Sequence, residues 1–172
     1  MFEIKNEVLM AHSAVDVAYR MLQIAKEKGK ELSNLQLQKL IYIAHGYFLG
    51  WQGKPLIKDT VQAWRYGPVL HEVYKQFKDN GRNKVSMEGI ENIQFSESFD
   101  DKENECLEGV LRLYGDDAPE YLINITHQEN TPWDEVWNVQ GGKHELFAEI
   151  PDDLIKNHYR KVVSDPKSVK GL

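Results

Sequence analysis

A nearly continuous apolar helix between residues 34 and 49 most constrains what this 172-residue chain can fold into. Ser33 precedes it as an expected N-cap, and Gln36 follows at the spacing of a capping box. Apolar residues cover most of the circumference: Leu35, Leu37, Leu40, Ile41, Ile43, Ala44, Tyr47 and Phe48. Because a helix that is apolar nearly all round is buried nearly all round, we expect it at the centre of the fold.

Further helices are expected where apolar residues recur at helical spacing or where capping residues stand. These helices are predicted for residues 13–29, for 68–80 with Pro68 in the first turn, around 107–114, and for 119–125, 131–137 and 151–162. Alternation in residues 60–66 predicts one short strand, and Ile93 and Phe95 suggest another. The expected fold is mainly α, a compact multi-helix domain around a buried central helix with a short extended or β segment.

Composition supports one globular domain over residues 1–163, followed by a flexible tail over residues 164–172. Hydrophobic residues make up 41% of the chain, which is enough for a proper core. The single cysteine, Cys106, allows no internal disulfide and fits a reducing compartment. The first residues lack the basic and apolar pattern of a signal peptide, and the longest apolar stretch is too short and too polar to span a membrane. We therefore expect a soluble, cytoplasmic protein.

The sequence offers no complete catalytic or metal-binding set. His71 and His144 each precede a glutamate, but the positions at which a zinc-binding helix needs a second histidine hold Lys75 and Ala148. Cys106 lies within an apolar helical pattern, where a thiol acts as a small hydrophobic group. We predict no metal, no cofactor and no enzymatic activity.

His127 is the best candidate for an alternative, enzymatic reading. It follows a short helix and precedes a polar loop, so it can act as a general base with Glu129, Lys39 or Tyr42 in a hydrolase or transferase. The simpler interpretation is that its ring hydrogen-bonds a backbone carbonyl and fixes the loop.

A second alternative is a DNA-binding regulator, because the first two predicted helices outline a helix-turn-helix. A recognition helix needs an exposed polar face, and the central helix is almost wholly apolar. The net charge of −6 also opposes a phosphate-binding surface. The sequence therefore favours a buried helix over nucleic-acid binding.

A compact aromatic segment after the central helix is the best candidate for a binding site. Trp64, Arg65 and Tyr66 are of the residue types enriched at interface hot spots, and Gly67 and Pro68 close the segment. We expect Arg65 and Tyr66 to be its exposed members. The acidic residues between Glu97 and Glu108 are expected to form a solvated face, or to steer a basic partner.

These motifs resemble the Panacea domain, also called the SocA-like antitoxin or phage-associated GepA-like domain. The resemblance extends from about Ser13 to about Tyr159, and it rests on LQLQKLIY at 35–42, GKPL at 53–56, AWRYGPV at 63–69, THQE at 126–129, and Pro132-Trp133. Residues 84–105 match no motif of the family, so they are expected to hold what is particular to this protein.

The resemblance implies a bacterial or prophage antitoxin that binds a cognate protein toxin, and some members of the family deliver the toxin to a protease. On this basis the expected partners are the toxin and a AAA+ protease. Candidate partner contacts are Trp64, Arg65, Tyr66, Gly67, Pro68, His127 and Trp133. A structural role is expected for Leu37, Lys39, Leu40, Tyr42, Thr126 and Pro132.

Overall fold

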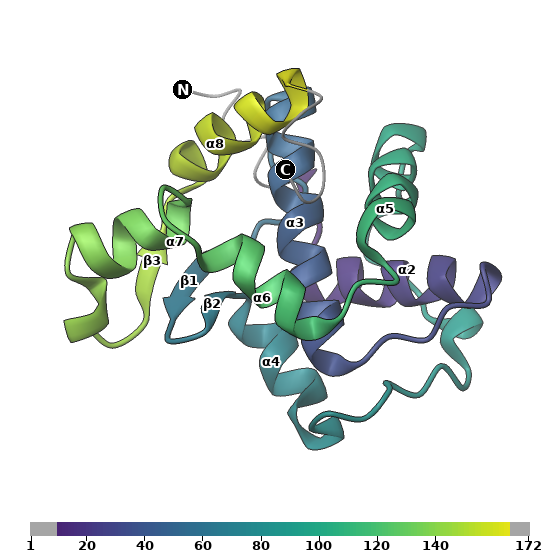
Figure 1. Ribbon diagram of the computed structural model, residues 1–172. Helices are drawn as coiled ribbons and strands as arrows, with labels where there is room; N and C mark the ends of the chain where they lie inside the picture. The colour runs from purple at the N-terminus through teal and green to yellow at the C-terminus, as the bar shows by residue number, and fades with distance from the viewer. Residues whose placement is uncertain (1–9, 166–172) are drawn as a thin grey trace.

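The computed structural model describes residues 10–165 of the chain (Figure 1). Its helices are α2 (Ala14–Glu27), α3 (Asn34–Gln52), α4 (His71–Phe77), α5 (Asp101–Tyr114), α6 (Pro119–His127), α7 (Pro132–Asp134) and α8 (Asp152–Ser164). The strands are β1 (Val61–Trp64), β2 (Gly67–Val69) and β3 (Ala148–Ile150). The expected mainly α fold with a small extended element is confirmed.

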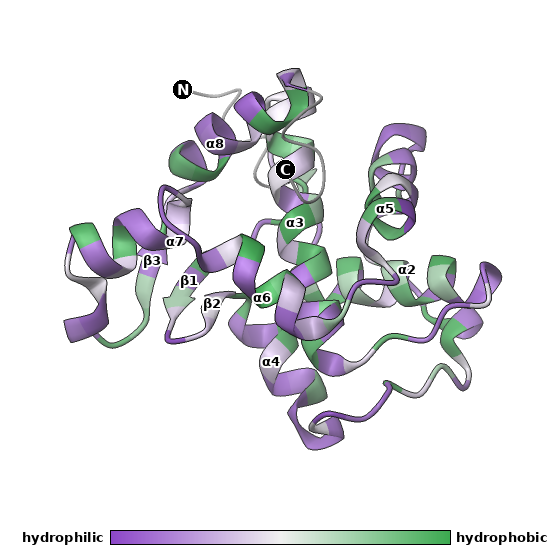
Figure 2. Cartoon of the chain, viewed as in Figure 1, coloured by the Kyte–Doolittle hydropathy of each residue, from purple (hydrophilic) through white to green (hydrophobic). Residues whose placement is uncertain are grey.

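Helix α3 is the buried centre of the molecule, as expected. The Ser33 hydroxyl accepts from the Gln36 amide, the Gln36 side chain accepts from the Ser33 amide, and Gly53 ends the helix in the left-handed conformation. Figure 1 shows α3 upright in the middle, and Figure 2 shows green apolar stretches along α2 and α3, with broad purple on α4. Local capping and apolar composition together place this helix in the core.

Helix α8 packs closely along the C-terminal half of α3. The close approach depends on Gly46 and Gly50, because a Cβ atom on either residue would collide with Tyr159 of α8. The Tyr159 ring fills this contact edge-on to Tyr42 and tilted against Tyr47. The two glycines are therefore needed by the packing inside the chain.

The three strands form one antiparallel sheet in the order β2-β1-β3. The strand expected at 60–66 is confirmed as β1, but the expected helix start at Pro68 is wrong. Pro68 lies in β2, paired with Ala63, and α4 begins only at His71. Gly67 has a φ of 117°, which no helix tolerates, and its chain direction is fixed by contacts with α3 described below. Strand β3 was not predicted.

Residues 82–100 form an irregular segment beside α2, and the strand expected at Ile93 and Phe95 is not present. The segment has one short 3₁₀ turn, Ile90–Asn92. Its carbonyl groups are held by side chains instead of a sheet: the Gln23 amide donates to Ile90 O at 2.9 Å. Contacts from α2 thus replace the strand pairing that alternation alone suggested.

The expectations for the two ends of the chain fall mostly on residues that the structure does not describe. Helix α8 extends through Ser164, the first residue of the tail expected at 164–172. The rest of that tail beyond residue 165 lies outside the described residues, and so do the first residues considered for a signal peptide. Within residues 10–165, no helix is long and apolar enough to cross a bilayer.

The packing of α8 on α3 gives a stability prediction. Gly50→Ala places a methyl group 2.6 Å from the Tyr159 backbone, so α8 must shift, and we expect a loss of about 1–3 kcal/mol in the free energy of unfolding. The matched control is Gly109→Ala on α5, where the nearest atom is 3.7 Å away; it should gain about 0.5–1 kcal/mol in dilute protein. Urea unfolding measures both, and equal stabilities would contradict this account of the α3–α8 contact.

Candidate binding site: an aromatic surface on a buried polar frame

Two polar side chains of α3 hold the outer edge of the β1–β2 hairpin. The Gln38 amide group binds both backbone groups of Leu70: its oxygen accepts from the amide at 2.9 Å, and its nitrogen donates to the carbonyl at 3.2 Å. The next residue, Lys39, donates to Pro68 O at 2.9 Å. An edge strand needs hydrogen-bond partners for its backbone, and here the central helix supplies them.

Lys39 is an amine buried in the core, with 1% of its surface exposed. Desolvation lowers its pKa to about 7, and within the described chain no carboxylate pairs with it. Gly67 leaves room for it, because a Cβ atom there would lie 2.8 Å from Nζ. Position 67 therefore needs glycine as long as the Lys39 amine occupies the adjoining space.

The second motif of the sequence holds the hairpin from the other side. The Trp133 indole donates to Trp64 O at 2.6 Å, and its ring stacks on Trp137 and meets His127 edge-on. Thr131 caps α7, with Pro132 in the first turn. His127 Nδ1 contacts the Ile123 carbonyl, so this nitrogen donates; the acceptor lies in the same helix, α6, and not in the loop that follows it.

We call the hydrogen-bonded groups of Gln38, Lys39 and Trp133, together with Gly67 and Pro68, the frame. An exposed aromatic surface lies on this frame. The Trp64 ring lies 5.0 Å from Tyr74 and 5.8 Å from Phe147, and His71 stacks on Phe147 at 5.3 Å. Tyr74 is 40% exposed and Phe147 is 44% exposed. We call Trp64, His71, Tyr74, Leu146 and Phe147 the aromatic surface. Large apolar groups gathered on a surface are typical of protein-binding sites.

The hairpin turn extends this surface. Tyr66 is 63% exposed, and the Arg65 guanidinium lies 5.4 Å from the centre of its ring. Phe147, on the other flank, has a φ of 58°, a left-handed conformation that is strained for an aromatic residue. Leu146 beside it is 84% exposed. Strained backbone with exposed apolar side chains is a feature of functional surfaces.

The candidate partner contacts from the sequence divide into two groups. Arg65 and Tyr66 are exposed, and Trp64 and His127 are half-buried; Gly67, Pro68 and Trp133 are buried in the frame. The residues expected to be structural are all buried: Leu37, Lys39, Leu40, Tyr42, Thr126 and Pro132.

Sequence reasoning did not identify His71, Tyr74, Leu146 or Phe147 as members of a binding surface. The available signal was the apolar pair Leu146-Phe147, which directly follows the polar run Lys143-His144-Glu145. Their joint position depends on the pairing of β3 with β1, which the sequence did not reveal.

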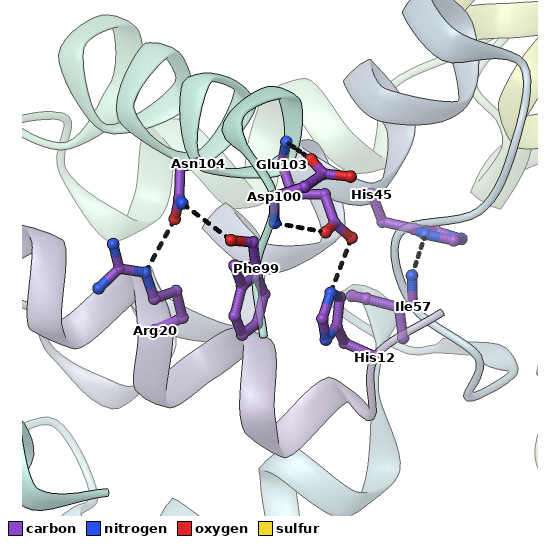
Figure 3. A network of polar contacts seen from close by, with 8 residues as sticks. All are labelled: His12, Arg20, His45, Ile57, Phe99, Asp100, Glu103 and Asn104. Carbon is purple, nitrogen blue, oxygen red and sulfur yellow. Dashed lines mark hydrogen bonds and ion pairs between the residues drawn. The ribbon is translucent and has the colours of Figure 1, made fainter. Parts of the chain in front are cut away.

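A separate polar cluster lies between α2, α3 and α5 (Figure 3). His12 Nε2 lies 2.7 Å from Glu103, whose other carboxylate oxygen accepts from the Asp100 amide in a capping box. His45 Nδ1 accepts from Ile57 N, and its Nε2 donates to Asp152 at 2.9 Å. Both imidazoles are fully enclosed and fasten chain segments together. Glu103, expected on a solvated face, is buried in this cluster.

The proposed enzymatic set is not gathered around an open site. Lys39 and Tyr42 are each 1% exposed; Lys39 points to β2, and Tyr42 packs on Tyr159. Glu129 is exposed on the loop after His127. Among residues 10–165, no cluster of three potential ligands gathers that could hold a metal ion.

Comparisons with known proteins match the part of the chain that contains the frame. The family model described as "Antitoxin SocA-like, Panacea domain" matches residues 37–134. Antitoxin SocA of Caulobacter vibrioides (strain NA1000 / CB15N) is 34% identical over 151 residues, which cover 84% of this chain and 80% of that protein. This chain belongs to the SocA-like antitoxin family. No solved structure matches it.

The matched range has a structural meaning within the SocA-like family. Residues 37–134 contain Gln38, Lys39, the β1–β2 hairpin and Trp133, so they include the hydrogen-bonded frame. Leu146 and Phe147 lie outside that range. The family match therefore covers the support of the aromatic surface but only part of the surface itself.

Lys39 gives a prediction for pH dependence. Its pKa is about 7 in the folded protein and 10.5 in the unfolded chain, so unfolding takes up a proton between these values and stability rises with pH. We expect a gain of about 1.5 kcal/mol in the free energy of unfolding between about pH 7 and pH 8.5. Above about pH 9 this gain levels off, because burial raises the pKa of Cys106 from 9.0 to about 12, so the folded thiol keeps a proton that the unfolded one loses.

Urea unfolding at both pH values tests this assignment, with Lys39→Met as the matched variant. Methionine has a similar volume and no charge, so the rise should disappear. The same pH dependence in Lys39→Met as in the original chain would show that another group is responsible.

Proposed function

We propose that this protein is an antitoxin that neutralises a cognate protein toxin by binding it directly in the bacterial cytoplasm. The aromatic surface and the adjoining tip, Arg65 and Tyr66, form the binding site. The exposed cluster around Trp64 is the observation that carries the proposal. Membership of the SocA-like antitoxin family supports the biological role.

The site has the physical character of a protein interface. Tyr, Trp and Arg contribute much contact area with few rotatable bonds, so their ordering costs little on binding. The rings of Trp64, Tyr74 and Phe147 already contact one another, which fixes their positions before a partner arrives. Preorganised side chains increase affinity because less conformational freedom is lost in the complex.

In this proposal the sequence candidates have different roles. Trp64, Arg65 and Tyr66 contact the toxin. Gly67, Pro68 and Trp133 are positioning residues, because they are buried and set the direction of the hairpin. His127 supports the Trp133 ring and lies at the margin of the site.

The enclosure of Lys39 and Tyr42 favours this binding role over the His127-centred hydrolase or transferase. The burial of α3 likewise favours it over a DNA-binding regulator, since this helix has no free face for the major groove. Neutralisation can end in masking of the toxin or in its delivery to a AAA+ protease. The two outcomes differ in the amount of toxin that remains in rescued cells.

We expect Tyr66→Ala and Phe147→Ala each to weaken toxin binding by about tenfold to a hundredfold. Both side chains are exposed, so the variants should keep the stability of the original chain to within about 1 kcal/mol. Glu108→Ala is the control, because Glu108 is exposed on α5, outside the aromatic surface. Calorimetry with the candidate toxin, the product of the neighbouring open reading frame, gives the affinities.

Growth after co-expression with that toxin gives the biological readout for the same variants. Equal rescue and equal affinity for Tyr66→Ala, Phe147→Ala and the control would remove the aromatic surface from the interface. Rescue accompanied by a co-purifying complex indicates masking. Rescue with loss of the toxin, reversed in protease-deficient cells, indicates delivery for degradation.

His127→Ala separates binding from catalysis. We expect rescue to be retained, with at most about a tenfold loss of affinity, because the ring only supports Trp133 at the margin of the site. Complete loss of rescue with intact folding and unchanged toxin binding would instead establish an enzymatic role for this histidine.

A further inference from the structure

An apolar groove of about 240 Å³ is lined by the C-terminal half of α3, by α5 and by α8. Its apolar lining comes from all three helices: Tyr47, Trp51, Val110, Leu113, Val162 and Val163. Trp51 and Val163 are 40% and 39% exposed. This groove plays no part in the frame or in the aromatic surface.

Gly109, in the middle of α5, forms part of the groove wall. A glycine inside a helix lowers stability by about 0.5–1 kcal/mol relative to alanine, so a contact that requires glycine is expected. Gly46 and Gly50 have one, because Tyr159 occupies the space of their missing side chains. A Cβ at Gly109 would meet nothing closer than the Arg112 guanidinium, at 3.7 Å. Packing inside the described chain does not require glycine there.

The charges on either side of Gly109 form a self-complementary pattern. Glu105 precedes it by four residues and Arg112 follows it by three; both are exposed, and both line the groove. Neither has an ion-pair partner in the described part of the chain. If two α5 helices cross antiparallel about a two-fold axis near Gly109, each Glu105 lies opposite the Arg112 of the other copy.

We infer that this face of α5 is a self-association surface, on which a second copy of the chain packs antiparallel across Gly109. The glycine allows the two backbones to approach closely, and two Glu105–Arg112 pairs set the register. The crossing covers the apolar groove, including Trp51 and Val163. In the antiparallel arrangement the two helix dipoles also lie side by side in opposite directions, which is the favourable orientation.

Sedimentation velocity of the full chain alone, from micromolar to submillimolar concentration, tests this surface. We expect a dimer at the upper concentrations. Glu105→Arg and Arg112→Glu each place like charges across the axis and should raise the dissociation constant by about tenfold or more. The double variant Glu105→Arg/Arg112→Glu restores opposite charges and should restore the dimer.

Glu108→Arg is the matched control, because Glu108 is exposed on α5 but does not line the groove, so its dimer should persist. Gly109→Gln adds a second test that leaves the charges unchanged, and it should produce a monomer with intact helical circular dichroism. A chain that remains monomeric at every concentration overturns the proposal. So does a dimer that survives both single charge reversals and Gly109→Gln.

Discussion

The structure depends on the hydrogen bonds between two buried polar side chains of α3 and the backbone of the β2 edge. Lys39 and Gln38 lie in the apolar core, where polar groups without partners cost several kcal/mol. Their partners are Pro68 O and both backbone groups of Leu70. If the hairpin separates from α3, the Lys39 amine and the Gln38 amide lose these hydrogen-bond partners. The helix and the hairpin therefore form one cooperative unit.

That unit separates the constraints on the protein into two kinds. The frame needs particular groups at particular atoms, such as the indole of Trp133 on Trp64 O. The aromatic surface needs only apolar groups of suitable shape, and Leu146 and Phe147 reach it from the loop before β3. A stable support with a variable loop is a general way to present a specific binding site.

The sequence was most informative where the cause of a structure is local. The Ser33–Gln36 capping box and the apolar circumference of α3 predicted the central helix correctly. The sequence misled at Pro68, which satisfies the local rule for a helix start but lies in β2 because Lys39 holds its carbonyl. Phe147 was missed because its position depends on a three-residue strand that pairs with residues far away in the chain.

Cys106 gives the protein a practical chemical property. It is the single cysteine of the sequence, its thiol donates to Ala44 O, and burial raises its pKa to about 12. A thiol reacts with electrophiles as the thiolate, so the folded chain is nearly inert to maleimides and disulfide reagents at neutral pH. A cysteine introduced on an exposed loop can therefore be labelled selectively with a fluorophore or spin probe, without first removing the native one.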